Sequence, residues 1–216
     1  MADVDDPNVE EVHVRLDPFD ITDRARAAYG PGGRLALPLT AQWPIFPFDA
    51  NGLRMRLVED PVLPEPSRHG EIPEECSTCR SGDDRFVWND ERWRVGMSDE
   101  PQSLPTLMLH SREHIDFDAL TDEMAAEMGV RLIWMQRALA SIEGVGRVHV
   151  AKWGDGGAHL HIFVMARPRG MIQLKGMFLT TWLHALPPLS PELWSAIRSH
   201  VKTTLAAAGG AVGEPT

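Results

Sequence analysis

The segment Gly154-Asp-Gly-Gly-Ala-His-Leu-His-Ile-Phe-Val-Met165 decides the fold of this chain. It begins with a glycine-rich turn, and from His159 onward its side chains alternate in character as they do in a β-strand. The alternation predicts that His159, His161 and Phe163 share one face of the strand. The two imidazole rings would then lie about 7 Å apart. The segment therefore predicts the second arm of a β-hairpin that presents two histidines on one face.

The flanking residues complete the pattern. Residues 147–153 are predicted to form the first arm of the hairpin, and apolar residues at spacings of three and four predict a helix over 121–142 with Thr121 as its N-cap. Two short strands around a polar turn are predicted within 85–95, and another strand at 106–110. Strands followed by one long helix and a hairpin indicate an α+β fold with an antiparallel sheet.

The chain divides into three segments, 1–70, 71–170 and 171–216. The first is rich in proline and is predicted to be an irregular arm, packed on the domain through apolar clusters at 35–39 and 43–48. The second is the domain that holds the sheet. The third is a C-terminal extension with a helix that starts near Ser190. The first dozen residues and the C-terminal tail are expected to fray.

Composition limits the class of protein. With 216 residues, a net charge of -10 and a pI near 5.3, the chain repels a long polyanion, so broad binding to nucleic acid is not expected. A local pocket for a small phosphorylated ligand is still compatible with this charge. The N-terminus has no basic and apolar leader, and no apolar run approaches the roughly 20 residues that cross a bilayer. We therefore expect a cytoplasmic protein without a membrane anchor.

The two cysteines are Cys76 and Cys79, separated by two residues. A disulfide at this spacing closes a very small loop and stabilises little, so a metal site or a redox pair fits better in a reducing compartment. Zinc takes four nitrogen or sulfur ligands in a tetrahedron, and His159 is the third candidate ligand. Three histidines are candidates for the fourth position: His114, which we favour, His110 and His69. A site with four protein ligands is closed, which indicates a structural zinc.

The stretch His159-Leu-His-Ile-Phe-Val-Met165 resembles the motif His-φ-His-φ-His-φ-φ, where φ is apolar, of the histidine-triad superfamily. Some similarity also extends to its galactose-1-phosphate uridylyltransferase branch. Zinc-bearing members carry Cys-x-x-Cys, then a histidine before the long helix, then the first motif histidine. Cys76, Cys79, His114 and His159 follow that order.

The resemblance implies roles for further residues. His161 would attack the α-phosphate of a nucleotide and form a covalent intermediate, as a hydrolase or a nucleotidyl or phosphoryl transferase. Asp99 would contact the ribose, although the Pro-Gln pair after it lies one residue early. The amides of Gly156 and Gly157 would hold phosphate oxygens, and Lys152 would offset their charge. The resemblance also implies a homodimer.

Phe163 departs from the motif, because its third position is histidine in the hydrolases and glutamine in the uridylyltransferase branch. A phenyl ring donates no hydrogen bond to a phosphoryl or leaving-group oxygen. Two alternatives to an enzyme of this type stay open. One is a non-catalytic, ligand-binding module with a structural zinc, and the other is thiol redox chemistry at Cys76 and Cys79.

Overall fold

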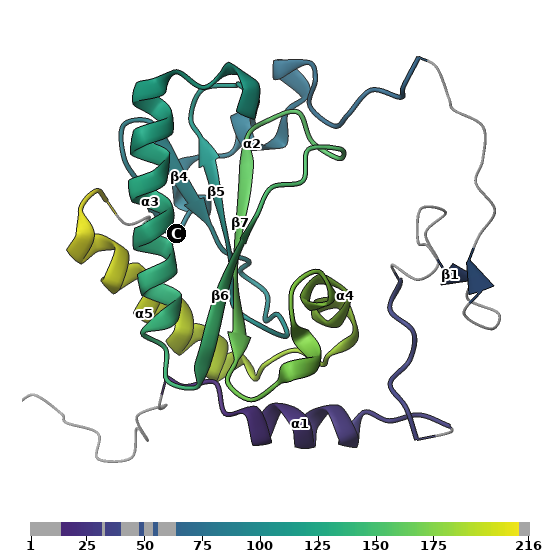
Figure 1. Ribbon diagram of the computed structural model, residues 1–216. Coiled ribbons are helices and arrows are strands. Elements are labelled where there is room, and N and C mark those ends of the chain that lie inside the picture. Colours follow the sequence, from purple (N-terminus) through teal and green to yellow (C-terminus); the bar gives the residue numbers. More distant parts are fainter. Residues whose placement is uncertain (1–13, 32, 40–47, 50–53, 56–63, 212–216) are drawn as a thin grey trace, which may run out of the picture.

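The computed structural model describes residues 14–31, 33–39, 48–49, 54–55 and 64–211 (Figure 1). Three stretches named in the sequence analysis lie mainly outside these ranges: the first dozen residues and the tail, which were expected to fray, and the apolar cluster at 43–48.

An antiparallel sheet of five strands forms the centre of the described domain (Figure 1). Its strands are β3 (Trp88–Asn89), β4 (Trp93–Gly96), β5 (Thr106–Ser111), β6 (Val145–Ala151) and β7 (His161–Pro168). Their spatial order is β3-β4-β5-β7-β6, so β7 lies between β5 and β6. A separate pair consists of β1 (Phe48–Asp49) and β2 (Arg54–Met55). The predicted α+β fold with an antiparallel sheet is confirmed.

Helix α3 (Asp122–Ala140) covers one face of the sheet (Figure 1). The Thr121 hydroxyl accepts a hydrogen bond from the Met124 N–H at 3.2 Å, so the predicted N-cap is confirmed. The side chains beneath the helix are fully buried aliphatics such as Leu107 and Leu109 of β5 and Val164 of β7. Helix α5 (Pro191–Ala208), capped by Ser190, packs beside α3. A large part of the hydrophobic core therefore lies between the sheet and these two helices.

The N-terminal segment contains a helix where the sequence predicted irregular structure. Helix α1 (Pro18–Ala27) starts at a proline and is capped by Asp17, whose side chain accepts the Phe19 N–H at 2.8 Å. Proline is tolerated at the first helical position because its missing N–H needs no partner there. Ile21 is only 2% exposed, so this helix packs on the domain. A second short helix that the sequence did not reveal, α4 (Phe178–Ala185), follows β7.

Short helical turns connect the larger elements. Helix α2 (Ser77–Arg80) carries the cysteine motif, and 3-10 helices lie at Pro73–Glu75, Asp83–Arg85, Phe117–Ala119 and Ile172–Leu174.

Strand β7 begins two residues later than predicted. His159 and Leu160 precede the strand, because the Leu160 N–H donates to the Ile115 carbonyl, beyond the end of β5, at 2.7 Å. Within the sheet, His161 pairs with His110 and Phe163 pairs with Met108. Directly paired residues of an antiparallel sheet share a face. These four side chains therefore lie on the face opposite α3.

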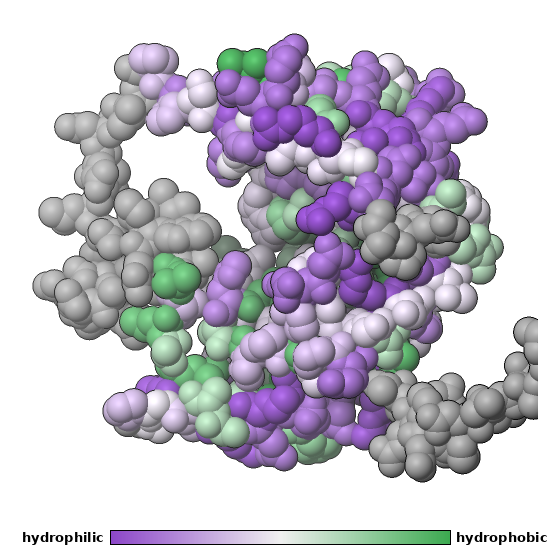
Figure 2. All heavy atoms as spheres, turned by 180° about the vertical axis from the view of Figure 1, so that it is seen from behind, coloured by the Kyte–Doolittle hydropathy of each residue, from purple (hydrophilic) through white to green (hydrophobic). Residues whose placement is uncertain are grey.

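One side of the molecule is largely polar. Hydrophilic residues predominate on the side of the molecule shown in Figure 2. Within the described residues, no helix combines the length and the apolar character needed to cross a bilayer.

Candidate metal centre and the adjoining histidine

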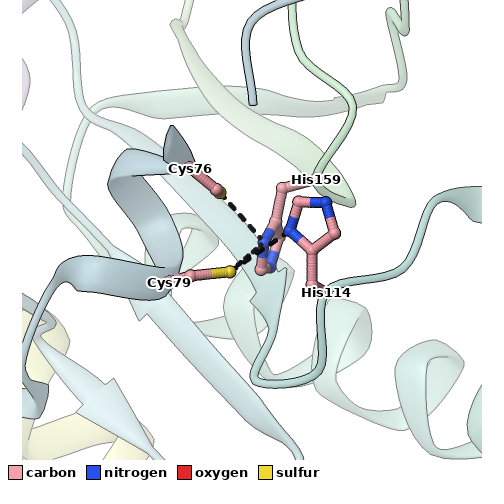
Figure 3. Close-up of side chains that lie close together, drawn as sticks. All are labelled: Cys76, Cys79, His114 and His159. Atoms are coloured by element: carbon pink, nitrogen blue, oxygen red, sulfur yellow. Dashed lines mark hydrogen bonds between the residues drawn. The ribbon is translucent and has the colours of Figure 1, made fainter. Parts of the chain in front are cut away.

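The Cys-x-x-Cys motif forms one turn of helix. Cys76 precedes α2 as its N-cap residue and Cys79 lies inside it, and the Arg80 N–H donates to the Cys76 carbonyl at 3.2 Å. Both cysteines are free thiols. The turn brings both sulfur atoms to the same side of the helix, facing the end of the sheet (Figure 3).

Four side chains converge at this point (Figure 3). Nδ1 of His159 lies 3.4 Å from the Sγ atoms of both Cys76 and Cys79, and Nδ1 of His114 lies 3.2 Å from Sγ of Cys79. All four ligand atoms lie within 4.8 Å of one another. In a tetrahedron with Zn–S bonds of about 2.3 Å and Zn–N bonds of about 2.0 Å, sulfur and nitrogen are roughly 3.5 Å apart. The spacing of these atoms therefore fits a zinc ion.

The hydrogen bonds of His159 direct one nitrogen to this centre. Its Nε2 lies 2.8 Å from the Ser111 carbonyl oxygen and 3.3 Å from the Ser111 hydroxyl. An Nε2–H that donates to the carbonyl leaves the lone pair of Nδ1 directed at the sulfurs. Burial lowers the pKa of His159, which favours the neutral ring that binds metal.

The thiols also fit a cation. Burial, followed by the interaction with Cys76, raises the pKa of Cys79 to about 11. Without a compensating cation, the Cys79 thiol would stay protonated at neutral pH. A bound zinc ion stabilises thiolates, and two sulfurs with two imidazoles form a common structural donor set for it. The donor set thus suggests zinc binding.

The other two candidate ligands lie elsewhere. Nε2 of His69 is 3.3 Å from the Ser77 hydroxyl, on the outer side of α2. The His110 ring lies 6.2 Å from the His159 ring, centroid to centroid, and packs edge-on against Phe86. Burial, followed by the neighbouring His159, lowers the pKa of His110 to about 3, so its ring is neutral. The structure thus brings His114, rather than His69 or His110, to the cysteines.

A network of charged side chains supports the cysteine turn, and the sequence analysis missed it. Arg112 forms two hydrogen bonds to the Asp83 carboxylate, at 2.9 and 2.8 Å. Arg94 donates to Asp83 at 2.9 Å and to the Thr78 carbonyl inside α2 at 3.4 Å. The hydrogen bond from Arg112 lowers the pKa of Asp83. This network joins α2 to β4 and to the end of β5.

His161, the first residue of β7, lies two positions after His159 of the metal centre, and its ring is half-buried. Its Nδ1 is 2.8 Å from the carbonyl oxygen of His159. Since a carbonyl only accepts, Nδ1 carries the proton and Nε2 carries a lone pair. No described residue forms a hydrogen bond with Nε2. The Phe163 ring packs edge-on against His161 at 5.5 Å, and Trp153 packs on Phe163 at 5.3 Å. An oriented imidazole with a free nitrogen can serve as a nucleophile.

Comparisons with known proteins find similarity only among solved structures. No family model and no curated protein sequence matches the chain. A histidine triad protein from Bradyrhizobium japonicum matches 56% of this chain and 89% of its own, with 17% identity and a TM-score of 0.46. A zinc-bound histidine triad family protein from Mycobacterium smegmatis matches 57% of this chain and 84% of its own, with 17% identity and a TM-score of 0.42.

This chain resembles the histidine-triad proteins in its fold. A uridylyltransferase is also similar, with 14% identity and a TM-score of 0.41 over 60% of this chain and 44% of its own. This chain therefore spans less than half of that enzyme. The roles proposed below for the site rest on its own side chains.

The glycine-rich loop lies against His161. A Cβ added to Gly157 would lie 3.5 Å from Cε1 of His161, and Gly156 has open space at that position. The Gly156 carbonyl accepts the His69 N–H at 3.0 Å, which ties the loop to the chain before the cysteines. Among the described residues, the N–H groups of Gly156 and Gly157 have no backbone acceptor. Both amides remain available to a ligand.

Lys152 and Asp99 already have protein partners. Nζ of Lys152 lies 3.3 Å from the Asp116 carboxylate, which also bonds Arg68 at 2.5 Å. Although its burial opposes the shift, the hydrogen bonds from Arg68, the Phe117 N–H and Lys152 lower the pKa of Asp116 to about 2. Asp99 pairs with Arg198 at 2.8 Å and borders a pocket on the open face of the sheet. The structure thus places Asp99 beside a ligand-sized cavity, whereas Lys152 belongs to an ion-pair cluster.

Proposed function

We propose that this protein transfers a nucleotidyl or phosphoryl group, to water or to another acceptor, through a covalent intermediate on His161. The observation that supports this proposal is the 2.8 Å contact from Nδ1 of His161 to the His159 carbonyl, which leaves Nε2 as the nucleophilic atom. The nearby amides of Gly156 and Gly157 suit phosphate oxygens.

The reaction has two balanced steps. The Nε2 lone pair attacks the α-phosphorus, an N–P bond forms, and the bond to the leaving group breaks with its electron pair on the leaving group. The ring then carries positive charge, which the Nδ1–H hydrogen bond to the carbonyl stabilises. In the second step a hydroxyl of water or another acceptor attacks phosphorus and loses its proton to solvent. The N–P bond breaks with its electron pair on Nε2, which restores the neutral ring with its proton on Nδ1.

Phe163 restricts the leaving group. Its ring packs against His161, where a histidine or glutamine would donate a hydrogen bond. A group that departs as a stable anion, such as a phosphate or sugar phosphate, needs no proton at this position. We therefore propose phosphoanhydride substrates, such as nucleoside diphosphate derivatives, over phosphoramidates. The pocket beside Asp99 would hold the nucleoside.

The proposed zinc has a structural role. With two cysteines and two histidines as ligands, no position is left for substrate. When bound, the ion links α2 to the residue before β7 and so fixes the backbone carbonyl that orients His161. Two reduced cysteines suit a reducing compartment, and we propose the cytoplasm. Edge strand β6 provides a surface on which a homodimer could form.

The test is a search for the covalent intermediate. The protein is mixed with a panel of nucleoside diphosphates and sugar nucleotides, and intact mass is measured at neutral pH because phosphorylated imidazoles are acid-labile. The wild type and the control His184→Ala, an exposed histidine of α4, should gain the mass of a nucleoside phosphate. His161→Ala should gain none. Absence of both adduct and turnover in the wild type would contradict the proposal.

A second candidate is a ligand-binding module without catalysis, which Phe163 favours. This candidate predicts reversible nucleotide binding without an adduct. Thiol redox chemistry predicts instead a purified protein without zinc whose two cysteines cycle between thiol and disulfide. Metal content and thiol titration separate these outcomes.

A further inference from the structure

A pocket of about 760 Å³ opens on the face of the sheet that carries His161. Its lining includes Arg85, Gly96, Asp99, Met108 and His110. This volume suits a nucleoside-sized ligand. Because His110 pairs directly with His161 across β5 and β7, it lies between the pocket and the proposed nucleophile.

His110 is the unusual member of this lining. The residue is only 9% exposed, and its Nδ1 is buried without a hydrogen-bond partner among the described residues. Phe86 packs edge-on against the ring at 5.8 Å and offers it no hydrogen bond. A buried polar atom without a partner destabilises the folded state, so native proteins rarely keep one without a reason. The fold therefore carries a buried polar ring, with one nitrogen unpaired among the described residues, at the edge of the pocket.

Gly96 leaves one edge of this ring uncovered. A Cβ at position 96 would lie 3.5 Å from Nε2 and 3.8 Å from Cδ2 of His110. A half-turn of the ring about its Cβ–Cγ bond exchanges Nδ1 with Cδ2. In either orientation one ring nitrogen therefore lies on the edge next to Gly96, which itself lines the pocket.

We propose that His110 is a specificity-determining residue, whose ring forms a hydrogen bond with a polar group on the nucleoside portion of the ligand. This inference rests on the proposed function, because it takes the pocket to hold the nucleoside while His161 meets the phosphate. An imidazole offers one N–H and one lone pair, so it can distinguish a hydroxyl, amine or ring carbonyl from an apolar edge.

Two variants test this role from different sides. His110→Leu removes the proposed hydrogen bond and replaces the imidazole with an apolar side chain of similar size. Gly96→Ala keeps His110 and places a methyl group over its exposed edge, at ordinary van der Waals distances from its neighbours. His149→Leu is the matched control, because His149 also has a buried Nε2 without a partner in the described structure but is not part of this pocket.

The probes are the four common ribonucleoside monophosphates and inorganic pyrophosphate, with affinities measured by calorimetry on the metal-loaded protein. His110→Leu and Gly96→Ala should each weaken the best-bound nucleotide about tenfold and leave pyrophosphate unchanged. His149→Leu should bind like the wild type. His110→Leu should also keep its zinc and match or exceed the wild-type melting temperature, because it removes an unpaired buried nitrogen.

Unchanged nucleotide affinity in His110→Leu would overturn the inference and leave the proposed function intact. Loss of zinc or of folded protein in that variant, with Gly96→Ala binding normally, would also overturn it, since His110 would then be structural. A wild type that binds no nucleotide of the panel would overturn the proposed function together with this inference.

Discussion

The metal corner, formed by Cys76, Cys79, His114 and His159, lies beside the open face of the sheet, which carries His161 and His110. The two regions differ in how fully the ring nitrogens of their histidines are paired. In the corner, both nitrogens of His159 are engaged, one by the cysteine sulfurs and the other by Ser111. On the open face, His161 uses only Nδ1 within the described protein, and Nδ1 of His110 has no partner there. Saturated polar groups are typical of structural sites, whereas an unsaturated polar group beside a pocket is a candidate for contact with a ligand. Changes in the corner should therefore affect stability and changes on the face should affect binding and chemistry.

Cys76→Ser should have the largest effect on stability. The variant loses a buried ligand at 2% exposure, so zinc content should fall from one equivalent to near zero. Because metal binding is coupled to folding, the melting temperature should drop by roughly 10 °C. Elemental analysis and calorimetry measure both. The control Ser77→Ala, on an exposed position of the same turn, should retain the metal. One equivalent of zinc in Cys76→Ser would contradict the assignment of the metal corner as a structural site.

Asp83→Asn should have an intermediate effect, because it weakens the network that supports the cysteine turn without touching a ligand. We expect a loss of about 1 kcal/mol in the free energy of unfolding at pH 7, a modest value because the carboxylate is partly exposed. The folded-state pKa of Asp83 lies below its usual value of 3.8, so its contribution is present above about pH 4 and is lost as pH falls further. The free energies of unfolding of the wild type and of Asp83→Asn, measured in urea, should thus become equal as the pH falls below 4. A constant difference over this range would contradict the assignment.

Ser111→Ala should affect the metal more than the fold. The hydroxyl is the longer of two contacts to Nε2 of His159, at 3.3 Å against 2.8 Å for the carbonyl. The carbonyl remains in the variant, so stability should change by less than about 1 kcal/mol. Outer groups that orient a metal-binding histidine influence affinity, and we expect about tenfold weaker zinc binding in competition with a chelator. Unchanged affinity would show that the carbonyl alone orients the ring.

The sequence predicted the elements whose signals are local. The helix over 121–142 and the hairpin follow from side-chain periodicity, and the structure differs from them by only a few residues at the ends. The predicted start of β7 was wrong, because the Leu160 N–H donates to the Ile115 carbonyl instead of continuing the strand pairing. This tertiary contact does not change the alternation of side chains in the sequence. Helix α1 was missed because its proline indicates a break unless the helix boundary is already known.

The same difference applies to the site. The spacing of Cys76 and Cys79 predicts either a metal site or a redox pair, and the two histidines that converge on them in the structure favour the metal. The network from Asp83 to Arg94 and Arg112 was not predictable, since it joins residues 11 and 29 positions apart that share no pattern. The unpaired nitrogen of His110 depends on which atoms surround it, and no sequence signal reports an absent partner.

Phe163→Gln should have the smallest effect on stability and the most selective effect on chemistry. The Phe163 ring is only half-buried between His161 and Trp153, so the melting temperature should change by only about 2 °C. The amide supplies a hydrogen-bond donor at the position where the wild type has none. If the wild type depends on leaving groups that depart as anions, its rate with a nucleoside diphosphate should exceed its rate with a nucleoside alkylphosphoramidate, whose amine must be protonated. Phe163→Gln should raise the phosphoramidate rate by about tenfold or more and leave the diphosphate rate nearly unchanged. The variant Phe163→Leu removes the ring without adding a donor, so an equal gain there would assign the effect to altered packing of His161 instead.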